Sequence, residues 1–151
     1  MLIPSVMKNT IQIKKAGKHD FEAICVLLAA ENLPTSDLNP ALDNFFIAIK
    51  GDAITGVIGM DKYGTDGLLR SAVVHKDYRN TGIAGSLVNQ LFDYAKEQGV
   101  TSLYLITNTA EEYFKIKGFI KIAKENVPAT VLQSKEFNGL CPASSVIMVR
   151  R

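Results

Sequence analysis

The segment of residues 72–87 constrains the fold of this chain more than any other. It begins with the β-favouring run AVVH, continues through the polar stretch KDYRNT, and ends in GIAGSL, where apolar residues take up helical spacing. The first backbone N–H groups of a helix have no intrahelical acceptor and attract anions. Gly82, Ala84 and Gly85 present little side chain to an approaching phosphate, and Arg79 adds a positive charge.

This segment therefore predicts a phosphate or pyrophosphate site. It is not a Walker loop, because no Gly-Lys-Ser/Thr follows, and its glycines are not spaced as in the dinucleotide-binding fingerprint. A strand-to-helix turn that needs small residues only for packing remains the alternative.

The rest of the chain places hairpins early and strand–helix–strand units late. Expected strands lie at residues 11–16, 45–50, 53–60, 68–75, 102–107, 119–123 and 144–149, and expected helices at 21–32, 82–98, 109–118 and 128–136. We expect Asp20 and Thr109 to cap their helices, residues 33–44 to form a loop with room for one short helix, and residues 61–67 to form a turn. This order predicts an α/β fold with a mixed, largely antiparallel central sheet flanked by helices.

Composition excludes several classes of protein. The 151 residues fit one domain, residues 1–151, with 47% apolar and 21% charged residues. Lysine and arginine number 17 against 15 acidic residues, which is too balanced for the basic face of a nucleic-acid binder. No apolar run reaches the ~20 residues of a membrane helix, and residues 1–6 lack the features of a signal peptide. We expect a cytoplasmic protein with neither membrane nor nucleic acid as a partner.

Two motifs give the chain a family resemblance. Arg79-Asn80-Thr81-Gly82-Ile83-Ala84 matches the Arg/Gln-x-x-Gly-x-Gly/Ala acyl-CoA signature of the GNAT acetyltransferases, and residues 113–119, YFKIKGF, are similar to that family's aromatic-x-x-x-Gly-Phe signature. The expected element order agrees over essentially the whole chain. The resemblance implies the acyl-CoA N-acyltransferase fold, with acetyl-CoA as co-substrate. With two cysteines and two histidines, we expect no metal.

The resemblance also assigns residues to the co-substrate. The CoA pyrophosphate would bind the backbone N–H groups of Arg79, Asn80, Thr81, Gly82, Ile83, Ala84 and Gly85, with a hydroxyl from Ser86. Pantetheine would lie beside the strand 68–75 and pair with the backbone of Val73 and Val74. In the family this strand bulges and diverges from the strand 102–107. An N–H group near Val74 would then polarise the thioester carbonyl.

The implied reaction is attack of an amine on the thioester, which needs a base for the amine and an acid for the CoA thiolate. Many family members supply that acid from a tyrosine where this chain has Phe114. Tyr113 is therefore the candidate acid, and the alternatives are Tyr104, Thr107 and water. Ordered water is the expected base, and the alternatives are Glu31, Asp61, Asp66 and His75.

Two residues are candidates for binding the acceptor. Arg70 interrupts an apolar strand, so it either recognises a carboxylate or other oxyanion, or forms a salt bridge to Asp61 or Asp66. Asn32 precedes the loop that covers the acceptor pocket in this family.

The resemblance points to a small-molecule amine as acceptor, such as an amino acid or an amino-acid-like toxin. Residues 127–146 are similar to the arsenic-resistance N-acetyltransferase subgroup, and Cys141 alone does not predict arsenic coordination. The alternatives are a protein or peptide amine as acceptor, and a CoA-binding sensor without turnover. Homodimers are common in the family, which leaves a homodimer open.

Overall fold

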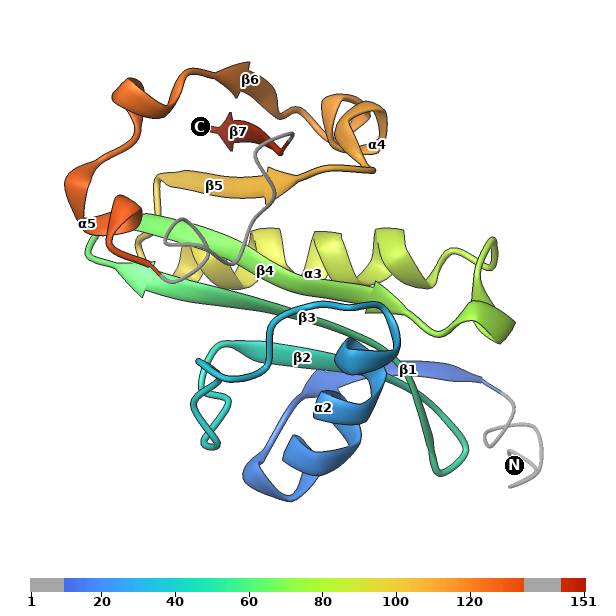
Figure 1. Cartoon of the computed structure of the whole chain (residues 1–151). Helices are drawn as coiled ribbons and strands as arrows, with labels where there is room; N and C mark the ends of the chain where they lie inside the picture. Colours follow the sequence, from blue (N-terminus) through green and yellow to red (C-terminus); the bar gives the residue numbers. More distant parts are fainter. Residues whose placement is uncertain (1–9, 135–144) are drawn as a thin grey trace. The chain divides into compact units, whose positions relative to one another are not determined.

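A computed structural model describes residues 10–134 and 145–151. Its strands are β1 (Ile11–Lys15), β2 (Phe45–Lys50), β3 (Ala53–Tyr63), β4 (Asp66–Val74), β5 (Ser102–Thr107), β6 (Ile120–Ile122) and β7 (Val146–Arg150). The helices are α2 (Phe21–Ala30), α3 (Ile83–Glu97), α4 (Glu111–Ile116) and α5 (Ala129–Leu132), and short 3₁₀ turns span η1 (Lys18–Asp20), η2 (Lys76–Tyr78) and η3 (Lys124–Asn126). Figure 1 shows these elements along the chain.

The strands form one mixed sheet in the order β1-β2-β3-β4-β5-β7-β6. Antiparallel pairing joins β1 to β2, β2 to β3, β5 to β7 and β6 to β7, whereas β4 and β5 are parallel. This arrangement confirms the predicted α/β fold with a largely antiparallel sheet. The chain divides into two compact units, which are described separately below; the single-domain organisation stays a prediction.

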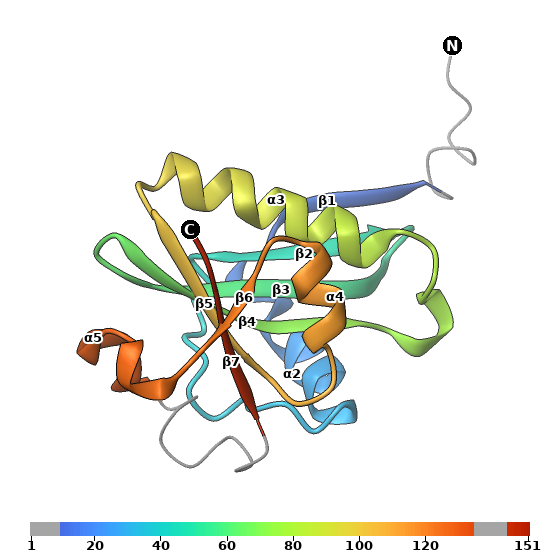
Figure 2. The same ribbon diagram turned by 90° about the horizontal axis from the view of Figure 1, so that it is seen from above.

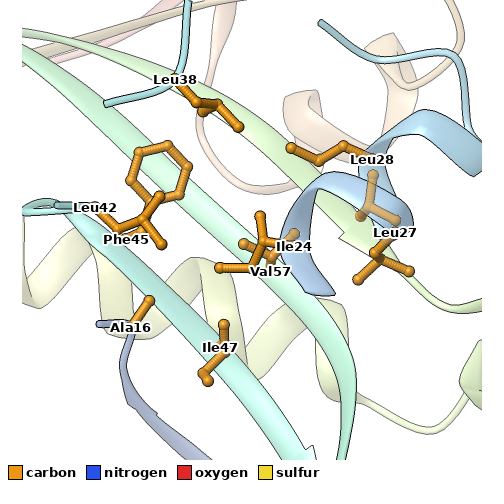
Figure 3. Packing of buried hydrophobic residues seen from close by; sticks show 10 residues of the cluster. Ala16, Ile24, Leu27, Leu28, Leu38, Leu42, Phe45, Ile47 and Val57 are labelled. Atoms are coloured by element: carbon orange, nitrogen blue, oxygen red, sulfur yellow. The ribbon is translucent and has the colours of Figure 1, made fainter. Parts of the chain in front are cut away.

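The first unit contains the described residues up to Met60 together with Ser71–Tyr94. Its main core lies where α2 packs on β2 and β3. The buried cluster consists of Ala16, Ile24, Leu27, Leu28, Leu38, Leu42, Phe45, Ile47, Val57 and Val73. Figure 3 shows Ile24, Leu27 and Leu28 of α2 facing the strand residues. Apolar residues at helical spacing on α2 therefore meet alternate residues of the strands.

The opposite face of the same strands carries α3. Phe46 lies between Phe45 and Ile47 in sequence and packs edge-to-face on Tyr94, with ring centroids 5.1 Å apart. A Cβ on Gly56 would meet the side chains of Leu87 and Ile83 at 3.0 and 3.3 Å. Within this unit α2 and α3 thus cover opposite faces of the strands (Figures 1 and 2).

The second unit contains Asp61–Arg70 and the described residues from Ala95 onward. In it β7 lies between β5 and β6 and pairs with both. Its core cluster consists of Leu68, Tyr104, Val127, Val131 and Val149. Arg150 donates from Nε to the carbonyl oxygen of Lys117 at 3.1 Å, which ties β7 to the end of α4.

Several local expectations are wrong. The turn predicted for residues 61–67 is confined to Gly64 and Thr65, because β3 extends to Tyr63 and β4 begins at Asp66. Residues 33–44, all of which the structure describes, form the predicted loop of turns and irregular backbone, without the short helix for which it had room. A turn at Gly51-Asp52 joins β2 to β3, and Gly51 has a φ of 62°.

Both predicted helix caps differ from the structure. The Asp20 carboxylate accepts the N–H of Gly17 at 2.9 Å and caps no N–H of α2. For α4, the hydroxyl of Thr107 instead of Thr109 accepts the N–H of Ala110 at 2.9 Å. The last predicted helix, residues 128–136, is observed as Ala129–Leu132, and its final two residues lie outside the described part of the chain.

Candidate active site

The loop before α3 has the backbone geometry of an anion-binding site. Asn80 and Gly82 have positive φ of 63° and 85°, and Arg79 before them is extended, so the chain turns sharply just before the start of α3. The first i→i−4 bond of α3 runs from the N–H of Ser86 to the carbonyl of Gly82 at 3.1 Å. The N–H groups of Ile83, Ala84 and Gly85 therefore precede the hydrogen-bonded helix and have no acceptor within it.

Space around Gly82 is open. Apart from Gly82 itself and its two chain neighbours, no heavy atom lies within 4 Å of the position that a Cβ would take on this residue, and residues 79–82 are exposed. An approaching phosphate would meet backbone N–H groups and a helix N-terminus there. These residues fit a phosphate group in chemistry, and the assignment of residues 79–86 to CoA stays a prediction.

The end of β4 presents its backbone in two directions. The N–H of His75 donates to Thr55 on β3 at 2.7 Å, and the carbonyl oxygen of Val73 lies close to Gly56 on the same strand. Because backbone groups alternate along a strand, the N–H and C=O of Val74 face away from β3. Of the two residues predicted to pair with pantetheine, Val74 has the suitable orientation, whereas the backbone of Val73 is turned toward β3.

Backbone irregularity also marks the middle of β4. Ser71 has a φ of 59°, which is rare for a residue with a side chain inside a strand. The parallel register joins β4 to β5 at Asp66–Leu68, before that point. The distortion lies within the strand for which the resemblance predicts a bulge.

Arg79 makes two contacts within the first unit. Its Nε donates to the carbonyl oxygen of Val74 at 3.0 Å, and its Nη2 donates to the carboxylate of Glu31. Glu31 is the residue that ends α2, 48 positions earlier in the chain. Sequence analysis missed this pair, since no local pattern connects residues so far apart.

Other polar groups of the loop are used internally. The Nδ1 atom of His75 accepts the N–H of Asp77 at 3.1 Å and so caps η2. The Thr81 hydroxyl donates to the carbonyl of Tyr78. Ser86 lies exposed on the first turn of α3.

In the second unit, Tyr113 has an unusual hydroxyl. Its oxygen is buried, and it has no hydrogen-bond partner among the described residues. Burial also raises the pKa of this phenol above its ordinary value, so the proton stays on oxygen at neutral pH. Phe114 is buried beside it and packs on Phe119 with ring centroids 5.4 Å apart. Tyr113 therefore carries a proton that no neighbouring acceptor holds in the described structure.

The alternative acids have structural roles. The Thr107 hydroxyl accepts backbone N–H groups at the start of α4. Tyr104 is 3% exposed and belongs to the core cluster beneath α5.

Arg70 forms the salt bridge that was one of its two predicted roles. Its Nη1 lies 3.0 Å from Oδ2 of Asp61, and the Arg70 side chain is 2% exposed. Asp61 therefore lies within β3, paired with Arg70, and not in the turn that was predicted for residues 61–67. Acceptor recognition by Arg70 stays a prediction.

Asn32, the other predicted acceptor residue, is exposed just after α2 and has a φ of 58°. Two of the candidate bases, Glu31 and Asp61, are each engaged by an arginine. Within residues 10–134 and 145–151, no three His, Cys, Asp or Glu side chains are grouped to hold a metal ion. The same residues include no helix with the length and apolar character needed to cross a membrane. Cys141 lies outside the described residues.

Comparison with known proteins identifies a family and individual proteins to which the chain is similar in sequence. Residues 16–119 match the model described as the Acetyltransferase (GNAT) family. An amino-acid acetyltransferase of Pectobacterium carotovorum is 20% identical over 132 residues, which cover 82% of this chain and 30% of the relative. A second one, from Pectobacterium atrosepticum, matches to the same extent. The chain thus spans about a third of the length of these curated relatives.

Solved structures share the fold. N-acetylglutamate synthase from Neisseria gonorrhoeae, complexed with coenzyme A and L-arginine, superposes with a TM-score of 0.79 at 20% identity, over 93% of this chain and 33% of the other. Rv2747 from Mycobacterium tuberculosis, in complex with CoA and NLQ, gives a TM-score of 0.77 at 20% identity, over 92% and 98% of the two chains. At this identity the likeness establishes the fold.

Proposed function

Because the chain belongs to the GNAT acetyltransferase family, we propose that it transfers the acetyl group of acetyl-CoA to the amino group of a small molecule, and that this acceptor is an amino acid or an amino-acid-like compound. The observation that carries the proposal is the loop before α3. Its acyl-CoA signature, the left-handed Asn80 and Gly82, and the N–H groups at the start of a 15-residue helix all lie in one short segment.

The co-substrate supplies the acetyl group as a thioester. The backbone N–H groups of residues 79–85 bind its phosphates, and the hydroxyl of Ser86 adds a donor. The N–H of Val74, directed away from β3, stabilises negative charge on the thioester oxygen. Tyr113 donates its proton to the departing thiolate. Ordered water removes the proton of the acceptor ammonium, because Glu31 and Asp61 are engaged by arginines.

An amino acid as acceptor is supported by the two amino-acid acetyltransferases among the relatives. A carboxylate on the acceptor would suit Arg70 in its chemistry, because the planar guanidinium matches the geometry of a carboxylate. The subgroup resemblance extends the proposal to arsenical amino acids. Part of the sequence that carries this resemblance, residues 135–144, lies outside the described residues.

The test is acceptor-dependent release of CoA thiol from acetyl-CoA, measured with a panel of amino acids, simple amines, arsenical amino acids and short peptides. The proposal predicts release with amino acids and with their analogues. Release with peptides alone would replace it by acetylation of a protein amine. CoA binding without release for any acceptor would favour a sensor without turnover, the alternative suggested by Phe114 at the position of the family's tyrosine.

A further inference from the structure

The Arg79 guanidinium is bound at two points by its own chain. Its Nη2 donates to Glu31 at the end of α2, and its Nε donates to the carbonyl of Val74 at 3.0 Å. Both partners belong to the same compact unit as the loop before α3. The charged side chain of the acyl-CoA signature is therefore shared with a carboxylate from another element.

A CoA phosphate at this loop would need the same cation. Phosphate and carboxylate oxygens both accept charge-assisted hydrogen bonds from guanidinium N–H groups. Glu31 also places a negative charge next to the position where phosphate charge must enter. To bind a CoA phosphate, Arg79 must therefore give up its contact with Glu31, and the loss of that contact lowers the net affinity for CoA.

The carbonyl of Val74 adds to this cost. It faces away from β3, on the side of the strand that pantetheine would pair with, and Arg79 occupies it in the structure. Movement of Arg79 toward phosphate would release Glu31 and the Val74 carbonyl together. The three groups thus form one contact set, Glu31–Arg79–Val74, that CoA must open.

We propose that Glu31 sets the affinity of the protein for CoA by competing with the CoA phosphates for Arg79. Glu31 is then an affinity-determining residue that acts through Arg79 and takes no part in the chemical step. This inference rests on the proposed function, because it assumes that the loop before α3 binds CoA.

The size of the effect follows from the exposure of the pair. The side chains of Arg79 and Glu31 are 48% and 39% exposed, so water and salt screen their attraction. Exposed pairs of this kind contribute about 0.2–1 kcal/mol, which corresponds to a change in affinity of up to about fivefold. Glu31→Gln removes the charge and keeps the size of the side chain.

The experiment measures the Kd of CoA by titration calorimetry for the full chain at low and at high salt. Glu31→Gln is expected to tighten CoA binding, by up to about fivefold at low salt and by less at high salt. Glu22→Gln is the matched control, since Glu22 lies on the first turn of the same helix and its substitution changes net charge equally. The control is expected to leave the Kd unchanged.

A double-mutant cycle shows whether the effect passes through Arg79. In the Arg79→Gln background, a substitution that the family signature itself tolerates, Glu31→Gln is expected to tighten binding no further. An unchanged or weaker affinity in Glu31→Gln, or equal tightening in Glu22→Gln, would overturn the inference and leave the proposed function standing. If neither the wild-type protein nor any variant bound CoA, the proposed function would fail and the inference with it.

Discussion

The hydroxyl of Tyr113 combines burial, an absence of partners among the described residues and a retained proton. A buried hydroxyl without a partner costs about 1–3 kcal/mol, so removing it by Tyr113→Phe is expected to leave stability equal or higher. If this hydroxyl is the acid, the same change lowers kcat by about 10²-fold. Thermal unfolding and kcat measured on one preparation therefore separate a packing role from a catalytic one.

The pH profile gives a second readout of Tyr113. Burial raises its pKa, so the protonated form is available up to pH values above the ordinary tyrosine range near 10. The favoured form is the neutral one, and its contribution to stability is present below that range and is lost as the pH rises through the raised pKa.

Tyr104→Phe is the matched control for the effect of Tyr113→Phe on kcat. A fall in kcat in that variant, with none in Tyr113→Phe, would transfer the role to Tyr104.

Arg70 and Asp61 allow another test at single residues. Removing the Asp61 charge leaves a guanidinium that is 2% exposed without its carboxylate, so Asp61→Asn is expected to destabilise the protein by about 1–3 kcal/mol. Denaturant unfolding measures this loss.

The acceptor role of Arg70 is tested separately, by kinetics. Arg70→Met keeps an apolar stem and removes the charge. If Arg70 binds the acceptor carboxylate, KM rises about tenfold for amino acids and stays constant for uncharged amines. Equal KM values for both acceptor classes would leave Arg70 with the salt bridge alone.

At the scale of elements, two glycines flank α3 and differ in their expected roles. Gly82 precedes the helix with a φ of 85°, and Gly99 follows it with a φ of 77°; apart from its own atoms and its two chain neighbours, neither has a heavy atom within 4 Å of a Cβ position. Gly82→Ala and Gly99→Ala therefore introduce similar backbone strain, of about 1 kcal/mol each.

Only the loop before α3 is expected to meet phosphate. Gly82→Ala should weaken CoA binding about tenfold or more, because its methyl group enters the open space beside the N–H groups, whereas Gly99→Ala should keep the wild-type Kd. Calorimetric Kd values and melting temperatures for both variants check this. Equal Kd values would place CoA elsewhere.

Elements with a strong local pattern could be predicted from the sequence. The bounds of β2 and β5 agree with the expected strands, since β-favouring apolar runs there end at clear turn signals. The end of β3 and the start of β4 could not be predicted. Asp61 reads locally as a turn residue, but Arg70 on β4 neutralises its charge and allows it to stay in the strand. Likewise, the predicted cap of α4 by Thr109 is absent, and it is the hydroxyl of Thr107 that accepts the N–H of Ala110, the residue just before the helix.

In the candidate site, too, some features could be predicted from local sequence pattern and others could not. Its phosphate loop is a contiguous segment whose glycine spacing and charge are visible in the sequence. The partner of Arg79 comes from α2, 48 residues away, and the orientation of Val74 depends on its pairing with β3. Contacts between distant segments follow from tertiary packing, which local pattern does not encode.

For the whole molecule, the net charge of +2 does not show where individual charged side chains lie or which of them are paired. Arg79 and Arg70 are each paired with a carboxylate, Glu31 or Asp61, so these two arginines contribute to the balance as members of specific ion pairs. A near-neutral chain can thus keep one cation at the loop where the anionic co-substrate is proposed to bind.

The proposed reaction of this protein is acetyl transfer to a small amine. Mass spectrometry of a reaction that contains the protein, acetyl-CoA and a single amino acid tests it most directly. The amino acid is expected to gain one acetyl group on its amine, at a rate that depends on the protein and on both substrates. If the measurement were repeated with each amino acid, amino-acid analogue and amine of the panel and none became acetylated, although CoA bound to the protein, acetyl transfer to a small amine would be contradicted.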